Sequence, residues 1–232
     1  MVPELIAHRG ASRERRENTL PAFARALELG ADGIELDAHV TRDGVVVVHH
    51  DAVPRRETPS PALTARPFGD LSAREVQSFC FPDGSGIPTL REVVDLVGDY
   101  ATLYIELKGR GIERAVIDCL RDGRGRYALH SFDHAAVKRV RTLSPDMPTG
   151  ILLASYLIEP ERALELAGAR DYWQSGDLVD GELVDRVHAV GGRVIVWTVN
   201  RPEDAAALAA IGVDGLCGDD LREIGPVIGH RP

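Results

Sequence analysis

The amino-acid sequence predicts an α/β protein, namely a (β/α)8 TIM barrel with a short insertion between the second strand and the second helix. Short apolar runs alternate along the chain with amphipathic stretches, which is the pattern of parallel strands buried between crossover helices. Eight such runs occur, and each is followed by a helical stretch. The length of 232 residues is close to the roughly 250 residues of a closed barrel. Together these observations favour a barrel over an open doubly wound sheet.

The predicted strands are short apolar runs, and the predicted helices are longer stretches in which apolar residues recur three or four apart. We place the strands at residues 5–8, 33–39, 102–107, 126–130, 148–153, 170–174, 193–199 and 213–216. We place the helices at residues 20–29, 90–97, 111–121, 134–143, 160–167, 181–190, 203–210 and 221–228. We therefore expect one catalytic domain over residues 1–232.

The alternation breaks between the second strand and the second helix. Residues 45–49 form a further β-rich run, and residues 52–87 are rich in Pro and Arg with one short helical piece at 72–78. Loops longer than about 15 residues in a compact domain tend to be functional, and the loops after barrel strands build the active site. We therefore predict that residues 45–87 form an insertion at the barrel mouth.

Composition limits the partners and the location. The formal net charge of -9 repels polyanions, so neither nucleic acid nor an anionic membrane is expected as the principal partner. No apolar run approaches the ~18 residues that cross a bilayer, and the first strand begins soon after Met1, which leaves no room for a signal peptide. We expect a cytoplasmic protein without stable membrane insertion. Its oligomeric state is not predicted.

Three cysteines occur in the chain, namely Cys80, Cys119 and Cys217. They are dispersed and odd in number, so they do not form a disulfide framework or a zinc site. We expect all three to be small buried residues.

Three acidic residues mark the carboxyl ends of neighbouring strands. Glu35 and Asp37 are two apart in the second strand, so side-chain alternation places both on one face. Glu106 lies near the end of the third strand, the next one in the barrel. Clustered carboxylates repel one another unless a cation neutralises them, and oxygen ligands suit Mg²⁺, Ca²⁺ or Mn²⁺ better than zinc or copper. The sequence thus predicts one divalent cation, Mg²⁺ or Ca²⁺ with Mn²⁺ as a further candidate; alternatively, Glu35 and Glu106 pair with barrel cations such as Lys108.

Two histidines lie where β-rich runs end. His8 ends the first strand, with Arg9 directly after it, and His50 closes the run at residues 45–49. An imidazole with a pKa near ~6.5 can give or take a proton at neutral pH. We predict that His8 and His50 act as acid and base, with His8 provisionally the base.

A lone histidine is more often structural than functional. We assign a structural role to His130, His134, His188 and His230. His39 stays undecided because it shares a strand face with Glu35 and Asp37.

The charge of this site indicates an anionic substrate. Three carboxylates and one divalent cation leave about -1, and two nearby cations, Arg9 and Lys108, make the balance positive. An arginine matches two phosphate oxygens at once, and Lys108 shares a strand face with Glu106. A phosphodiester is therefore the predicted ligand of these residues.

Two signals are weaker. Residues 17–19 precede Leu20 and Pro21, so we interpret them as a helix N-cap with proline in the first turn. Trp197 ends the seventh strand, where it can either pack in the core or form an apolar wall for a glycerol chain. Both interpretations of Trp197 stay open.

These motifs together resemble the glycerophosphodiester phosphodiesterase family from one end of the chain to the other. The matching motifs are His8-Arg9-Gly10, Glu17-Asn18-Thr19, residues 30–37 and 41–44, His50-Asp51, residues 87–90, Glu106-Leu107-Lys108, Ser131-Phe132-Asp133, residues 197–200 and residues 212–215. The resemblance implies a barrel, a cation held by Glu35, Asp37 and Glu106, catalytic His8 and His50, and phosphate contacts from Arg9 and Lys108.

The resemblance also implies a reaction, the metal-dependent hydrolysis of a glycerophosphodiester to glycerol 3-phosphate and an alcohol. Two departures stand out: Arg16 occupies a position where the family often has Pro, and residues 217–220 replace a Thr-Asp-x-Pro segment. We expect these departures to alter loop shape and substrate preference without touching the metal or acid–base groups.

Three other functions are weighed. A phospholipase D-like enzyme acting on lysolipids or sphingolipids needs an apolar entrance, and residues 52–87 hold few large apolar side chains. A metal-dependent barrel lyase or isomerase generally relies on a Lys or a single His as base, so it would not need both histidines. A non-catalytic phosphodiester-binding protein would not need the complete set of catalytic residue types.

Overall fold

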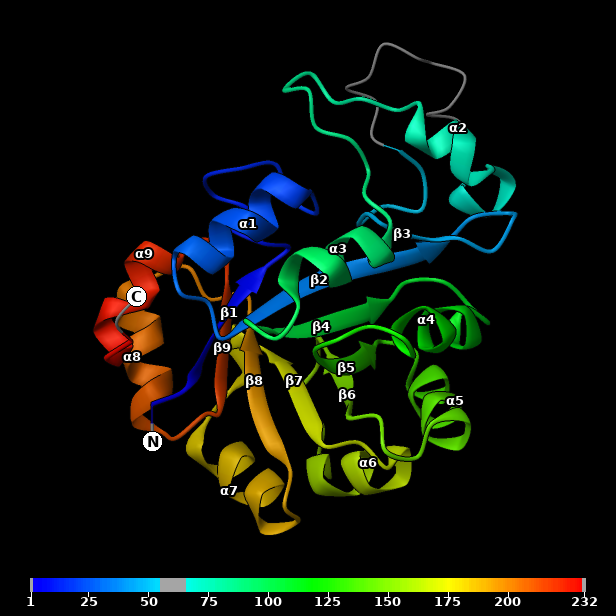
Figure 1. Ribbon diagram of the computed structural model, residues 1–232. Coiled ribbons are helices and arrows are strands. Elements are labelled where there is room, and N and C mark those ends of the chain that lie inside the picture. Colours follow the sequence, from blue (N-terminus) through cyan, green and yellow to red (C-terminus); the bar gives the residue numbers. More distant parts are fainter. Residues whose placement is uncertain (1, 55–65, 231–232) are drawn as a thin grey trace.

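A computed structural model describes residues 2–54 and 66–230 and confirms the predicted barrel (Figure 1). The parallel strands follow the order β1-β9-β8-β7-β6-β5-β4-β2, and β1 pairs with β2 to close the ring. These strands are β1 (Glu4–His8), β2 (Gly33–Val40), β4 (Thr102–Leu107), β5 (Arg126–Ser131), β6 (Thr149–Leu153), β7 (Asp171–Ser175), β8 (Arg193–Trp197) and β9 (Gly215–Gly218).

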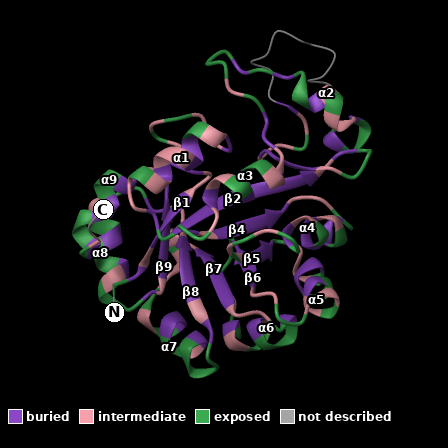
Figure 2. Ribbon diagram, in the orientation of Figure 1, coloured by how far each residue is buried: buried purple, intermediate pink, exposed green. Residues whose placement is uncertain are grey.

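Helices surround the ring and connect successive strands (Figure 1). They are α1 (Leu20–Glu28), α3 (Leu90–Val97), α4 (Glu113–Leu120), α5 (His134–Leu143), α6 (Pro160–Ala167), α7 (Gly181–Ala189), α8 (Pro202–Ala210) and α9 (Leu221–Ile224). Their start signals are local: α3 begins in a reciprocal capping box between Thr89 and Glu92, and Pro160 and Pro202 open α6 and α8. Figure 2 shows buried strands at the centre and exposed residues on the outer faces of the helices.

The predicted boundaries differ from the structure by a few residues. The last strand was expected at 213–216 and lies at Gly215–Gly218, and the strand expected at 193–199 ends at Trp197. The last predicted helix, 221–228, divides into α9 and a 3₁₀ turn, η3 (Pro226–Ile228). Proline has no N–H to continue the helical hydrogen bonds, which explains the division.

The segment between β2 and α3 carries its own small elements. Strand β3 (Val46–Val48) pairs antiparallel with the end of β2, and η1 (Phe68–Asp70) and α2 (Ala73–Gln77) follow. These elements pack around a separate apolar cluster of Val47, Phe68, Leu71, Val76, Phe79, Phe81 and Ile87. Residues 55–65 of the predicted insertion lie outside the described residues. In Figure 1, α2 and the described residues next to it project beyond the barrel on the side of β3.

Side-chain alternation divides the core into two layers. Residues such as Ile34 and Leu36 point outward and pack between the strands and the helices. The inner layer fills the barrel and consists of Ile6, Tyr104, Ala128, Leu152, Trp173, Ile195 and Cys217. Cys217 is therefore buried as expected, whereas the expectation is wrong for Cys119, which is half-buried, and for Cys80, which is exposed in the projecting segment.

A charged network closes the barrel beneath this inner layer, at the amino ends of the strands. Tyr104 Oη donates to Glu4 at 2.5 Å, and Arg193 lies 3.0 Å from the same carboxylate. Arg170 donates two hydrogen bonds to the fully buried Asp171, at 2.9 and 2.7 Å, and Arg193 lies 3.5 Å from it. Two guanidinium groups thus match two carboxylates at this end of the described structure.

No helix in residues 2–54 and 66–230 is long and apolar enough to cross a membrane.

Candidate active site

A cavity of about 260 Å³ opens at the carboxyl ends of the strands. Its lining combines charged, imidazole and aromatic side chains: His8, Arg9, Glu35, His50, Glu106, Lys108, His130, Phe132, Leu152, Trp173, Trp197 and Cys217. With one exception, every site residue predicted from the sequence lines this cavity. The exception, Asp37, lies beside it in contact with Arg9 and Lys108.

Strand register explains why these side chains meet. His8 on β1 is level with Glu35 on β2. One pleat higher, Asp37 on β2 is level with Glu106 on β4, which in turn is level with His130 on β5. Residues two apart on a strand share a face, so all five side chains point into the barrel. The predicted convergence of the carboxylates follows from this register.

Asp37 is almost completely buried and is surrounded by cations. Its Oδ1 lies 3.2 Å from Lys108 Nζ, and its Oδ2 lies 3.2 Å from Arg9 Nε and accepts a 2.7 Å hydrogen bond from Asn18 Nδ2. Burial alone would raise the pKa of Asp37, but Lys108, Arg9 and Asn18 outweigh it and lower that pKa to about 2. Asp37 is therefore ionised at neutral pH.

The interpretation of residues 17–19 as a helix N-cap followed by proline in the first turn is confirmed at Thr19, and Asn18 and Glu17 make additional contacts in the site. Asn18 makes two hydrogen bonds with Asp37, because its Nδ2 donates to Asp37 Oδ2 and its Oδ1 accepts from the Asp37 backbone N–H at 3.3 Å. Glu17 accepts a 3.1 Å hydrogen bond from Arg9. Thr19 does occupy the N-cap position, but its side chain makes no capping hydrogen bond. Asn18 has a left-handed backbone conformation, with a φ of 56°, which asparagine adopts more readily than most residues.

Glu35 and Glu106 are in the opposite electrostatic situation. Burial, followed by repulsion from Asp37 and Glu106, holds the pKa of Glu35 well above its usual range. Burial also raises the pKa of Glu106, to about 7, although Lys108 Nζ lies 2.8 Å from its Oε2. The surrounding side chains therefore do not stabilise the ionised forms of these two carboxyl groups as they do that of Asp37.

The donor set fits a divalent cation. The alternative left open by the sequence was that Glu35 and Glu106 pair with barrel cations such as Lys108. Glu106 does contact Lys108, but among the described residues Glu35 makes no ion pair with a Lys or Arg side chain. The imidazole of His130 lies near Glu35, with 3.8 Å between His130 Nε2 and Glu35 Oε1. A bound cation would restore the ionised form of both glutamates, and clustered carboxylate oxygens are ligands that Mg²⁺, Ca²⁺ and Mn²⁺ accept.

His8 is held by a carboxylate from the other end of the chain. Its Nδ1 lies 2.7 Å from Asp219 Oδ1, and Asp219 also accepts hydrogen bonds from Ser12 Oγ at 2.9 Å and Asn200 Nδ2 at 2.7 Å. Burial raises the pKa of Asp219, but the contacts with His8, Asn200 and Ser12 outweigh it and lower that pKa to about 2. An ionised carboxylate can only accept, so the proton of neutral His8 sits on Nδ1 and leaves the Nε2 lone pair free.

The expectation that the departure at residues 217–220 touches no acid–base group is therefore wrong. Asp219 lies within that segment and contacts His8 directly. The two residues are 211 positions apart, and strands β1 and β9 bring them together.

The second imidazole, His50, has a carboxylate of its own. His50 Nδ1 lies 2.8 Å from Asp51 Oδ1. Two further imidazoles fix the backbone here, because His39 Nε2 lies 3.3 Å from the His50 carbonyl and His49 Nδ1 lies 3.0 Å from the Asp51 carbonyl. His39, undecided from the sequence, also stacks on Phe68 and thus supports this segment.

The opposite side of the cavity is apolar. Trp197 and Phe132 meet edge to face, with ring centroids 5.5 Å apart and planes at 82°. Phe132 is 47% exposed, so part of its ring remains open to a ligand. Leu152 and Trp173 form the floor. For Trp197, the interpretation as an apolar wall agrees with this position.

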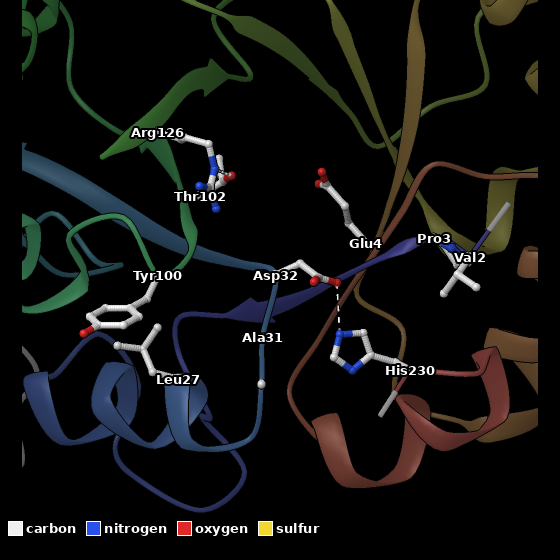
Figure 3. A pocket seen from close by; sticks show the side chains of 11 residues that line it. Val2, Pro3, Glu4, Leu27, Ala31, Asp32, Tyr100, Thr102, Arg126 and His230 are labelled. Atoms are coloured by element: carbon white, nitrogen blue, oxygen red, sulfur yellow. Dashed lines mark hydrogen bonds and ion pairs between the residues drawn. The ribbon is translucent and has the colours of Figure 1, made fainter. Parts of the chain in front are cut away.

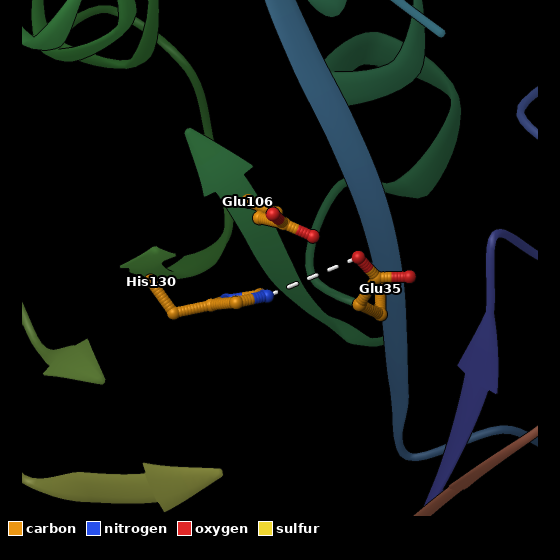
Figure 4. Close-up of side chains that lie close together, drawn as sticks. All are labelled: Glu35, Glu106 and His130. Carbon is orange, nitrogen blue, oxygen red and sulfur yellow. Dashed lines mark ion pairs between the residues drawn. The ribbon is translucent and has the colours of Figure 1, made fainter. Parts of the chain in front are cut away.

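His130 lies inside the site, which contradicts the structural role expected from the sequence. Its ring stacks on Trp173 at 4.4 Å, and its Nε2 points toward Glu35 and Glu106 (Figure 4). Burial lowers the pKa of His130 to about 3, so the ring is neutral. The other three histidines assigned a structural role do not line the cavity; His134 contacts the Leu152 carbonyl, His188 contacts Asp214 and His230 contacts Asp32.

A second hollow, of about 820 Å³, lies near the amino ends of the strands (Figure 3). Asp32 is central to it, accepting from the Leu5 backbone N–H at 2.9 Å and lying 3.2 Å from His230. Arg126 on its rim donates to Thr102 at 3.2 Å. Asp32 and His230 thus contact each other within this hollow, and Arg126 contacts a neutral hydroxyl.

Comparison with known proteins identifies one family. Residues 8–223 match the model of the glycerophosphoryl diester phosphodiesterase family. The chain is 35% identical over 232 residues to a glycerophosphodiester phosphodiesterase of Caldanaerobacter subterraneus subsp. tengcongensis, covering 93% of each chain. It is 31% identical over 232 residues to a glycerophosphodiester phosphodiesterase of Bacillus altitudinis, covering 94% of this chain and 95% of the other.

Solved structures agree with the sequence relatives. An Oleispira antarctica phosphodiesterase in complex with the product sn-glycerol-3-phosphate superposes with a TM-score of 0.87 at 25% identity, covering 98% of this chain and 97% of that one. A glycerophosphodiester phosphodiesterase from Thermotoga maritima gives a TM-score of 0.81 at 28% identity, covering 94% and 95%.

Proposed function

The chain belongs to the glycerophosphoryl diester phosphodiesterase family and is a phosphoric diester hydrolase, and we propose that it hydrolyses glycerophosphodiesters to glycerol 3-phosphate and an alcohol with the help of a divalent cation and two histidines. One observation carries the proposal. His8, His50, Glu35 and Glu106 line a single cavity that also presents the side chains of Arg9 and Lys108. Two proton-transfer groups, carboxylate ligands and two cations are thus combined around a space the size of a small substrate.

The proposed cation ligands are Glu35, Asp37 and Glu106. Asp37 Oδ1 is buried and accepts no hydrogen bond from the described residues, so it keeps lone pairs available beside Lys108. When bound, the cation would supply Lewis-acid stabilisation of the negative charge on the phosphoryl oxygens. The ion is Mg²⁺, Ca²⁺ or Mn²⁺ on ligand type, since all three prefer oxygen donors.

Arg9 and Lys108 position the phosphodiester in this proposal. Asp37 orients both, since it lies 3.2 Å from Arg9 Nε and 3.2 Å from Lys108 Nζ. Arg9 is further tied to Glu17, and its backbone N–H donates to Glu35 at 3.2 Å. Cations held rigidly in a water-poor site stabilise developing charge without reorganisation.

The two imidazoles exchange protons with the reacting oxygens. His8 is the proposed base, because Asp219 keeps its proton on Nδ1 and leaves Nε2 free to remove the proton of the attacking oxygen. His50 is the proposed acid, and Asp51 orients its ring through the contact at Nδ1. As the attacking oxygen bonds to phosphorus, the bond to the alcohol oxygen breaks and that oxygen takes the His50 proton. The attacking oxygen comes from water or from the glycerol 2-hydroxyl; in the second case a cyclic phosphate forms first, and water then opens it to glycerol 3-phosphate.

The test is direct. Purified protein is incubated with glycerophosphocholine and Mg²⁺, Ca²⁺ or Mn²⁺, and glycerol 3-phosphate is measured with and without a chelator. We expect release that the chelator stops and that His8→Ala and His50→Ala each lower by about 10²- to 10⁴-fold. Failure to turn over any glycerophosphodiester with any of these ions would refute the proposal.

One observation favours a second candidate, phospholipase D-like cleavage of lysolipids or sphingolipids. The apolar wall of Phe132, Trp197 and Leu152 offers contact to an alkyl chain or an apolar head group. Lysophosphatidylcholine in the same assay decides between the two, because choline release at a rate equal to or above that from glycerophosphocholine would favour the lipid substrate.

A further inference from the structure

His130 has a position that its neighbours do not explain. It is the second-last residue of β5, its side chain is 1% exposed, and its ring is stacked almost parallel to Trp173, with 13° between the planes. The strand register sets it level with Glu106, one strand away. Stacking and register together fix the direction in which the ring nitrogens point.

The imidazole lacks the hydrogen bonds that a buried histidine normally makes. Its Nδ1 is buried and has no hydrogen-bond partner among the residues that the structure describes. Its Nε2 lies 3.8 Å from Glu35 Oε1, which is too far for a hydrogen bond. Among the described residues, neither ring nitrogen thus has a hydrogen-bond partner, and the Nε2 lone pair is available for a ligand.

The Nε2 atom is directed at Glu35 and Glu106, the two glutamates whose ionised forms are disfavoured. Figure 4 shows the His130 ring edge directed at the carboxylates of Glu35 and Glu106, each from a different strand. One donor atom from each of the three residues lies within 4.8 Å of the other two. Donors bound to one cation at about 2.0–2.6 Å are at most about 5 Å apart, so this spacing suits a shared ion.

We propose that His130 Nε2 is a ligand of the divalent cation together with Glu35 and Glu106, and that this nitrogen makes the site favour a first-row transition ion such as Mn²⁺ over Ca²⁺. Imidazole nitrogen is a ligand that transition ions accept readily and that Ca²⁺, which takes oxygen ligands, does not prefer. The inference rests on the proposed cation site and adds to it a donor that resemblance to the family did not suggest.

The test uses bound Mn²⁺ as its own reporter. Pulsed electron paramagnetic resonance of the Mn²⁺-loaded full chain should show coupling to a ¹⁴N nucleus, and growth with ¹⁵N-histidine should replace this signal by that of ¹⁵N. His130→Gln should still bind Mn²⁺ but lose the coupling. His134→Gln should retain it, because His134 lies on α5 and contacts the Leu152 carbonyl instead of the cavity.

Affinity gives a second readout that does not involve catalysis. Titration calorimetry should show Mn²⁺ binding weakened by about tenfold or more in His130→Gln, because a ligand is lost. Ca²⁺ binding should weaken less, so the dissociation constant for Ca²⁺ divided by that for Mn²⁺ should be smaller in the variant than in the wild type. A ratio equal to that of the wild type would contradict the proposal.

Two other histidines line the cavity and provide the decisive comparison. His8→Gln and His50→Gln should keep the nitrogen coupling, so the donor is identified even if His130→Gln folds poorly. The proposal is overturned if the wild type shows no histidine coupling, or if the coupling disappears with His8 or His50. If glycerol 3-phosphate release depends on a cation but the nitrogen coupling is absent, only the proposal that His130 is a ligand is overturned. Absence of any cation binding would overturn both proposals.

Discussion

The two ends of the barrel are built from the same strands but are balanced differently. At the amino ends, two carboxylates, Glu4 and Asp171, meet the guanidinium groups of Arg170 and Arg193. At the carboxyl ends, three carboxylates, Glu35, Asp37 and Glu106, share two cationic side chains, those of Arg9 and Lys108. In the described structure the charges of these groups match at the first end, while at the second end burial and repulsion among the carboxylates disfavour the ionised forms of Glu35 and Glu106. The first region supports the fold by itself, and the second is the one at which we propose a bound cation.

The largest expected effect is the loss of activity when a proposed cation ligand, Glu35, is replaced. Glu35→Gln keeps the size of the side chain but deletes its carboxyl group. We expect turnover of glycerophosphocholine to fall to the background rate, because the cation loses a ligand. Circular dichroism serves as the control for folding. If the variant retained activity with an unchanged metal requirement, Glu35 would not be needed.

Next in size is the contact that orients His8. In Asp219→Asn the new amide can donate to Nδ1, which favours the tautomer with its proton on Nε2 and no free lone pair there. We expect kcat to fall by about 10²-fold or more while KM changes little. Asp220→Asn is the matched control, because its side chain makes no capping hydrogen bond. Equal kinetics of the two variants would refute the positioning role.

The amino end should respond through stability instead of activity. Asp171→Asn removes the acceptor of two guanidinium groups, although burial raises the pKa of this carboxyl and offsets part of the gain. We expect the free energy of unfolding to fall by about 1.5–3 kcal/mol, with kcat unchanged. Urea titration measures the first quantity. A catalytic defect larger than the loss of folded protein would show that the two ends are not independent.

The smallest effect is expected at the apolar wall. Phe132→Ala removes an edge-to-face partner of Trp197 and an open aromatic surface of the cavity. Aromatic contacts of this kind contribute about 0.5–1.5 kcal/mol, so kcat/KM should fall by about 2- to 10-fold. Phe79→Leu, in the separate apolar cluster of the projecting segment, is a comparison variant that should leave kcat/KM unchanged.

Local patterns predicted much of this molecule. The spacing of Glu35 and Asp37 and the position of His8 at a strand end were sufficient to bring them to one rim, because period-2 alternation and parallel register are local rules. Strand and helix order followed from periodicity in the same way. The boundaries were less well predicted where a proline such as Pro226 interrupts a helix.

Contacts across the chain could not be predicted in this way. Asp219 reaches His8 over 211 positions, and Asn18 reaches Asp37 from a loop whose conformation has no periodic signal. His130 is a different case, since the strand predicted at 126–130 ends on it and the rule that selected His8 applied equally. Its position in the cavity was missed because a single histidine without neighbouring carboxylates in the sequence was interpreted as structural.

The most direct test of the account is the melting temperature with and without a divalent cation. In a chelator, Glu35→Gln should be at least as stable as the wild type, because it replaces a buried carboxyl group whose ionised form is disfavoured by burial and by Asp37 and Glu106. Millimolar Mg²⁺, Ca²⁺ or Mn²⁺ should raise the melting temperature of the wild type and leave that of Glu35→Gln nearly unchanged. Equal shifts in both proteins, or a chelated variant as destabilised as Asp171→Asn, would contradict the claim that this end of the barrel is completed by a cation.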